Sequence, residues 1–147
     1  MARLAQFLRV WAAAGLLCGS AAVRADVYVI VHPEYAVRAM TRAQTLDLFM
    51  GRTRHFPNGD PALPLDQPRN SPARARFYRA LTGMDLAQVN SYWARLMFSG
   101  QTMPPESLSS EAAVLAAVKH NPAAIGYVLA EPADRSVHVV FVLKEAP

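Results

Sequence analysis

Hydrophobic positions along the chain predict four strands. Residues 27–31 read VYVIV, and two runs of the same kind lie at residues 125–129 and 137–143. Continuous apolar runs of this length, rich in β-branched residues, are typical of strands that are buried on both faces. Residues 62–65 form a weaker candidate, because Pro64 has no N–H to donate to a neighbouring strand.

Apolar residues at helical spacing predict four helices between these strands. They cover residues 41–50, 73–82, 86–98 and 110–119. The second helix has the clearest boundaries, since Ser71 can cap it, Pro72 occupies its first position and Gly83 follows its last residue. Strands and helices alternate along much of the chain, which favours a mainly parallel sheet covered by helices.

Two aromatic pairs fall on the predicted helices. Phe77 and Trp93 lie on the apolar faces, where we expect them to pack in the core. Tyr78 and Tyr92 flank those faces, and we expect them to be half exposed. The pairs therefore indicate packing rather than a platform for stacking a ligand.

The first 25 residues have the features of a secretory signal peptide. Arg3 and Arg9 make the start basic, an apolar run follows at residues 10–18, and small residues lead to Ala25. We expect cleavage after Ala25, with Ala22 as the second candidate, and secretion of the remaining chain across the inner membrane into the periplasm.

Two other interpretations of this segment are weaker. A transmembrane anchor needs about 18 or more consecutive apolar residues, and Arg24 ends the run too early. A lipid anchor on Cys18 is disfavoured because the bulky Leu17 precedes it. We expect no stable membrane insertion after cleavage.

The composition indicates what kind of domain remains after cleavage, at residues 26–147. The full chain has 147 residues, 52% of them hydrophobic and 18% charged, which suits one folded domain and excludes a disordered chain. Removal of residues 1–25 takes away three arginines and the single Cys, which leaves 12 Lys and Arg against 11 Asp and Glu. This near-neutral balance argues against a nucleic-acid binder. The loss of the Cys excludes a disulfide framework and a thiol nucleophile.

One stretch combines features of an anion site. At a helix N-terminus, free backbone N–H groups and the positive end of the helix dipole bind anions. Ser71 adds a hydroxyl at the start of the second predicted helix, and Arg69, Arg74 and Arg76 add positive charge around it. The alternative is that Ser71 is only a helix cap and that the arginines form a solvated face.

The chain offers little for catalysis or metal binding. Its four histidines, His32, His55, His120 and His138, show no pair separated by three to five residues, so we expect no metal site. No Gly-x-Ser-x-Gly motif or nucleophile–base pair is recognisable, so we expect neither an enzyme nor a cofactor.

Three passages, in order along the chain, resemble the phosphate-binding component of bacterial ABC transporters. Residues 46–52 resemble the end of its IF-x-GK helix, residues 66–77 its R-x-x-x-SGT-x-x-x-F anion loop and helix, and residues 123–128 its GAIGYV strand. Together these passages span most of residues 26–147. The chain also resembles a group of short exported proteins that carry only this part of the binding protein.

The resemblance implies an α/β fold, a single lobe of the type II periplasmic-binding-protein-like kind, with a mixed, mostly parallel sheet flanked by helices. It implies that phosphate or a similar oxyanion binds at the helix N-terminus, in connection with ABC-type transport. The site residues carried over are Ser71 and Ala73, and we conjecture that Arg69 or Arg74 replaces an arginine that the motif lacks here.

Two departures from the family pattern bear on this implied site. Gln67 stands where the family has that arginine, and Pro72 and Ala73 replace a glycine and a threonine. Pro72 removes a backbone donor and Ala73 a hydroxyl. Because charge-assisted hydrogen bonds contribute roughly 1.5–3 kcal/mol each, anion binding should weaken by several powers of ten. In addition, solute-binding proteins close two lobes around their ligand, and residues 26–147 make one.

Three classes of function therefore remain, of which the third, a hydrolase, is kept only for completeness. In the first, the exported domain binds an oxyanion weakly, or more strongly as a homodimer with two facing lobes. In the second, the domain has kept the fold without the ligand and acts as an adapter that contacts an envelope protein through the former cleft face.

Overall fold

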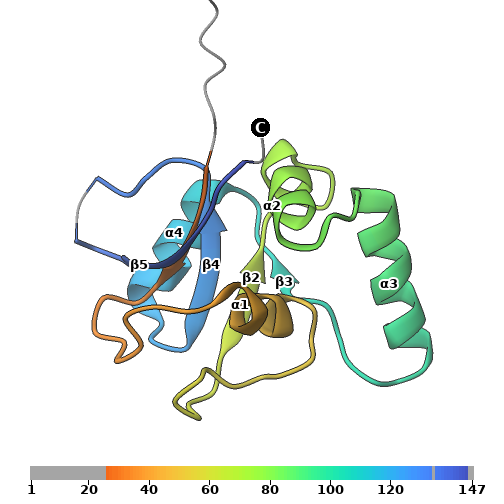
Figure 1. Cartoon of the computed structure of the whole chain (residues 1–147), viewed down its shortest axis with the longest axis horizontal. Coiled ribbons are helices and arrows are strands. Elements are labelled where there is room, and N and C mark those ends of the chain that lie inside the picture. Colours follow the sequence, from red (N-terminus) through yellow and green to blue (C-terminus); the bar gives the residue numbers. More distant parts are fainter. Residues whose placement is uncertain (1–25, 134, 146–147) are drawn as a thin grey trace, which may run out of the picture.

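The computed structural model describes residues 26–133 and 135–145 as a five-stranded sheet with four helices (Figure 1). The expected signal peptide, residues 1–25, lies outside this part of the chain. The elements in chain order are β1 (Val27–Val31), α1 (Arg42–Phe49), β2 (Leu63–Asp66), α2 (Pro72–Thr82), α3 (Leu86–Phe98), β3 (Glu106–Ser107), α4 (Glu111–His120), β4 (Ala124–Val128) and β5 (His138–Leu143). None of the described helices is long and apolar enough to span a bilayer.

The sheet is mixed, as expected, but its described strand pairings are two parallel and two antiparallel rather than mostly parallel. Its strand order is β3-β2-β4-β1-β5. β2 pairs in parallel with β3 and β4, whereas β1 pairs antiparallel with β4 on one side and with β5 on the other. Within the described sheet, β1 therefore runs against the other four strands. Its register places Val29 between Tyr127 of β4 and Phe141 of β5.

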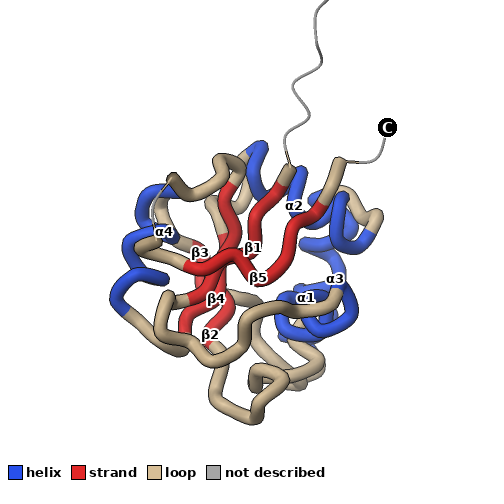
Figure 2. Tube along the Cα trace, turned by 60° about the vertical axis from the view of Figure 1, so that its left-hand side comes forward, coloured by secondary structure: helices blue, strands red, loops and turns tan. Residues whose placement is uncertain are grey.

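Each face of the sheet carries its own hydrophobic cluster, because successive residues of a strand point to opposite faces. Val29 and Val31 belong to the cluster that packs against α1, α2 and α3, whereas Ile30 belongs to the smaller cluster against α4. Figure 2 shows α4 on one side of the strands and the other three helices on the opposite side. In the larger cluster the ring of Phe77 stacks on that of Tyr127, with 3.8 Å between the centroids.

Capping residues set the helix boundaries. The Ser71 Oγ accepts a hydrogen bond from the Arg74 N–H at 3.1 Å, and Gly83 follows α2 with a φ of 78°. This left-handed conformation is unfavourable for residues that carry a Cβ, so the glycine determines where α2 ends. Thr41 and Asp85 cap α1 and α3 through their side chains in the same way as Ser71. These boundaries agree with the sequence-based expectation to within one or two residues.

Two expectations about individual segments were wrong. Tyr78 is fully buried rather than half exposed, because its hydroxyl donates to the buried carboxylate of Asp66. The strand β3 was not expected, because Glu106 and Ser107 show no apolar pattern and join the sheet only by pairing with β2. Tyr92, in contrast, is half-buried as expected, and its hydroxyl donates to a backbone carbonyl of the α1 C-terminus.

Candidate functional site

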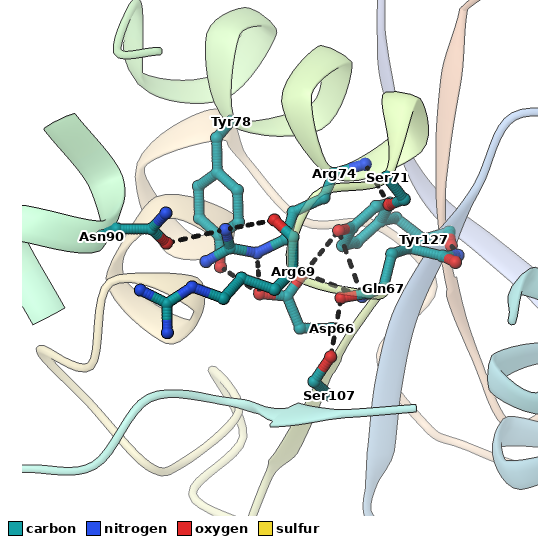
Figure 3. A network of polar contacts seen from close by, with 9 residues as sticks. All are labelled: Asp66, Gln67, Arg69, Ser71, Arg74, Tyr78, Asn90, Ser107 and Tyr127. Atoms are coloured by element: carbon teal, nitrogen blue, oxygen red, sulfur yellow. Dashed lines mark hydrogen bonds and ion pairs between the residues drawn. The ribbon is translucent and has the colours of Figure 1, made fainter. Parts of the chain in front are cut away.

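The carboxylate of Asp66, the last residue of β2, lies at the centre of a buried polar network (Figure 3). Asp66 is 2% exposed and accepts four hydrogen bonds. The donors are the Gln67 N–H at 2.8 Å, Arg74 Nε at 2.8 Å, the Tyr78 hydroxyl at 3.1 Å and the Tyr127 hydroxyl. Both carboxylate oxygens are satisfied, which is the condition under which a charged group is stable in a protein interior.

Arg74 connects three elements and is itself 5% exposed. Besides the bond to Asp66 of β2, its Nη1 donates to the Arg69 carbonyl at 3.1 Å and to Asn90 Oδ1 of α3 at 3.0 Å. Burial by itself lowers the pKa of Arg74, but the hydrogen bond and the charge of Asp66 outweigh burial and raise it. The guanidinium therefore stays charged, and Asp66 neutralises it inside the protein.

Two tyrosines complete the surroundings of Asp66. Burial, followed by the negative charge of Asp66, raises the pKa of both Tyr78 and Tyr127 above the ordinary value for tyrosine. Both hydroxyls therefore remain protonated at neutral pH and act as donors. The network joins α2, β2 and β4 through charge and hydrogen bonds, and its first role is structural.

Gln67, at the position where the resemblance implies an arginine, is turned into the protein. It is 1% exposed, and its Nε2 donates to the Tyr127 carbonyl at 3.0 Å. Its own carbonyl accepts from Ser107 Oγ of β3 at 2.8 Å. Gln67 therefore fastens the end of β2 to both neighbouring strands, and its side chain is not directed to solvent.

Few donors are free at the N-terminus of α2. Pro72 has no N–H, the Arg74 N–H is bonded to Ser71 Oγ, and the Ala75 N–H is bonded to the Ser71 carbonyl at 3.1 Å. Of the first-turn amides described, the Ala73 N–H is the one left for an external acceptor. The half-buried Ser71 hydroxyl accepts from Arg74 and still has its own hydrogen to donate.

Arg69 supplies the exposed charge at this place. It precedes α2 by three residues, and Figure 3 shows its guanidinium extending away from the buried network. Arg69 lines an open cavity of about 300 Å³ together with Asp66, Arg74, Asn90 and Ser107, and with apolar residues of α3. Of the residues that the sequence analysis singled out, Arg69, Ser71, Ala73 and Arg74 lie at one helix start, with Arg74 engaged internally, whereas Arg76 lines a different cavity.

A larger cavity, of about 770 Å³, lies away from this helix start, between α1, the C-terminal half of α2 and the ends of β1 and β5. Its cationic lining residues are Arg42, Arg52, Arg76, Arg79 and Lys144. Three of these are already engaged: Arg42 donates to carbonyls at the α2 C-terminus, Arg52 pairs with Asp47 and Lys144 pairs with Asp26. Because three of its five cations are engaged within the protein, this cavity is not a better anion site than the α2 N-terminus, although it is larger.

Metal-ligating side chains are not grouped. Among residues 26–133 and 135–145, no cluster of three or more His, Cys, Asp or Glu residues could hold a metal ion. Two of the histidines have local partners, since His32 Nδ1 accepts from the Glu34 N–H and His138 Nε2 lies 2.8 Å from the Arg38 carbonyl.

Sequence reasoning found the helix start but missed the network beneath it. Asp66, Asn90 and Ser107 carry no motif, and they meet only because β2, α3 and β3 converge there. One signal was available, since an acidic residue at the end of a predicted strand lies eight residues before Arg74, at the first turn of the next helix.

No protein-family model and no curated protein sequence matches this chain. Similarity appears in solved structures. A phosphate ABC transporter substrate-binding protein of Clostridium perfringens with bound phosphate superposes with a TM-score of 0.61 at 19% identity, over 79% of this chain and 45% of that one. An ABC-type phosphate transport receptor of Vibrio cholerae gives 0.61 at 16% identity, over 79% and 46%. PstS of Borrelia burgdorferi gives 0.59 at 12% identity, over 80% and 47%.

These similarities confirm the fold that the sequence resemblance implied, an α/β lobe of the periplasmic-binding-protein-like kind. The chain spans less than half the length of each of these three proteins. At such identities the similarity concerns the fold alone.

Proposed function

We propose that this chain is an exported, single-lobe protein that binds a phosphate-class oxyanion at the N-terminus of α2. The observation that carries the proposal is the start of α2, where the Ser71 hydroxyl keeps its hydrogen to donate, the Ala73 N–H has no acceptor within the helix, and the exposed Arg69 lies three residues upstream. A helix N-terminus of this kind favours anions through its dipole and its free amides. Support comes from the fold, which is shared with proteins described as binding or transporting phosphate.

The proposed site should bind an anion weakly, because it offers few contacts. Asp66 cancels the charge of Arg74, so Arg69 is the uncompensated cation beside the helix start. Pro72 removes one amide donor, and the Ser71 cap uses another. With three contacts partly exposed to water, we expect a dissociation constant of about 1 mM or above, equivalent to roughly 4 kcal/mol.

The proposed location is the periplasm, and the proposed context is ABC-type transport. The basic start, apolar run and small residues before Asp26 support export. The connection with transport rests on the names of the proteins that share the fold. Under this proposal the chain meets its anion outside the inner membrane.

The direct test is a titration of phosphate and of sulfate, followed through the backbone amide of Ala73 by ¹⁵N NMR. Ser71→Asp keeps an oxygen that caps the Arg74 N–H, so α2 remains capped, while its charge repels an anion. We expect a saturable shift of the Ala73 amide in the native protein and its loss in Ser71→Asp. The matched control is Ser110→Asp, at the N-cap of α4, which should leave the titration unchanged. A native Ala73 amide that does not move would contradict the proposal.

A second candidate function is an adapter without a ligand. The inward position of Gln67 and the missing N–H of Pro72 favour it, because both reduce what an anion could bind. In that case the Ala73 amide stays unshifted at all phosphate concentrations. The polar network then serves stability alone, and the surface around α3 becomes the place to look for an envelope partner.

A further inference from the structure

The exposed large hydrophobic side chains of the described residues gather in one region. They are Leu63, Met97, Phe98 and Met103, with exposed fractions of 39%, 45%, 94% and 63%. Two adjoining cavities lie among them, of about 230 Å³ and 300 Å³, which share Trp93, Pro104 and Pro105 in their walls. We call these seven residues the apolar patch.

The apolar patch is formed by α3, by residues 103–105 that follow it and by the start of β2, and Figure 1 shows α3 at one end of the molecule. Scattered exposed hydrophobic residues are ordinary, but a grouped set around concave surfaces is typical of an interaction site. Phe98 is the last residue of α3 and is almost fully exposed, so the fold itself gains little from an aromatic side chain there. Its side chain is therefore available to contact another molecule.

The patch has both halves of a self-complementary contact. Phe98 projects from the rim of the 300 Å³ cavity, which is large enough to receive a phenyl ring of a neighbouring molecule. Projection and cavity on the same face are what a two-fold symmetric interface requires, because each copy must supply both. Charged residues border both cavities: Arg69 lines one, and Glu106 lines the other together with Arg54, which donates to Thr102. Neither Arg69 nor Glu106 has an ion-pair partner among the described residues, so the two can face each other across such a contact.

We propose that a second copy of this chain docks on the apolar patch, with Phe98 of each copy entering the other's cavity and Arg69 of each copy facing Glu106 of the other. The 300 Å³ cavity is lined by Asp66, Arg69 and Arg74. The partner copy therefore covers the cavity that Arg69 lines, beside the first turn of α2, and removes water from it. Only this last consequence rests on the proposed anion site; the docking itself does not.

Sedimentation equilibrium on the purified protein tests the docking. The patch is small, so we expect a weak dimer with a dissociation constant of about 10–100 µM, visible as a mass that rises with concentration. Phe98→Asp should weaken it at least about tenfold, because it places a charge in an apolar cavity. Since Phe98 is 94% exposed, the variant should keep the melting temperature of the native protein.

The matched control is Ser91→Asp, an exposed position of α3 two turns before Phe98 and outside both cavities of the patch, which should dimerise like the native protein. A monomer at every concentration, or a dimer that Phe98→Asp leaves intact, would overturn the proposal. The charge contact has its own test: Arg69→Glu and Glu106→Arg should each weaken the dimer, and the double variant should restore it. Failure of the double variant to recover would remove the Arg69–Glu106 contact from the proposal.

Phosphate titrations keep the two proposals apart. At about 5 µM protein the chain is mostly monomeric under this proposal, so the Phe98→Asp variant and the native protein should bind phosphate equally at that dilution. At about 1 mM protein, the native protein should bind phosphate more tightly than Phe98→Asp. Dimerisation without any phosphate binding would support the docking and contradict the anion site.

Discussion

Asp66 and Arg74 form an ion pair with 2.8 Å between Oδ2 and Nε, and both side chains are less than a tenth exposed. The pair joins the end of β2 to the first turn of α2. It therefore fixes the position of the helix start to which we assign the anion. The same pair explains why the arginine nearest that helix start is not free to hold a ligand.

Asp66→Asn should lower the free energy of unfolding by about 3–5 kcal/mol, because it leaves the Arg74 charge buried without a counter-charge. Urea denaturation measures this loss. Asp47→Asn is the matched control, since it breaks an exposed pair with Arg52 and should cost less than about 1 kcal/mol. Equal losses in the two variants would show that burial of the Asp66–Arg74 pair has no energetic importance.

Alkaline pH should destabilise the protein through Tyr78 and Tyr127. Because the pKa of each is raised in the folded state, the unfolded chain loses these protons first as pH rises past the ordinary value of about 10. The stabilisation is complete below about pH 10 and falls above it, by up to roughly 1.4 kcal/mol per pH unit for each tyrosine.

Urea denaturation between about pH 9 and pH 11 measures this slope. Tyr127→Phe removes one titrating group. It should therefore reduce the change in the free energy of unfolding per pH unit by the contribution of one tyrosine. The share of the tyrosinate absorbance that Tyr127→Phe removes should appear together with unfolding rather than before it. Early ionisation of either residue in the folded protein would contradict the burial seen here.

Pro72→Ala should tighten phosphate binding by about 2–10-fold, because it restores one amide donor at the α2 N-terminus. Calorimetry or NMR titration measures the change. Pro122→Ala, an exposed proline near the C-terminus of α4, is the control for loss of a proline alone. If Pro72→Ala left the affinity unchanged, phosphate would not contact the first turn of α2.

Gly126→Ala should destabilise the protein by about 1–3 kcal/mol through overpacking. A Cβ at position 126 would lie 2.5 Å from Cγ1 of Val114, on the helix that covers this face of β4. Val114→Ala creates the missing space. The double variant should therefore lose less free energy of unfolding than the two single variants lose together. Additive losses in thermal denaturation would mean that α4 is free to move away from the sheet.

The helices were the most predictable part of the fold. Ser71, Pro72 and Gly83 are local signals, and each acts on the backbone within a few residues of itself. The strand β3 was not predictable in this way. Its two residues are exposed and polar, and β3 exists because its backbone pairs with Leu65 and Asp66 of β2, some 40 residues earlier.

The candidate site was predictable in position but not in arrangement. Ser71 was recognised from its place before a helix, which is again a local signal. Arg74 looked equally available, because an arginine is seldom buried unless a partner neutralises it. The sequence does not show that Asp66, Tyr78 and Tyr127 surround it, since their contact depends on how β2, α2 and β4 pack.

The pairing of β1 with β5 brings the two ends of the described fold together. Val27 lies opposite Leu143, and the Asp26 and Lys144 side chains meet beyond them at 2.8 Å. Polypeptide added before β1 and polypeptide added after β5 therefore depart from neighbouring points. This lobe can be spliced into a loop of an unrelated host protein through two short linkers, and joining its ends would make a circular polypeptide without rearranging the sheet.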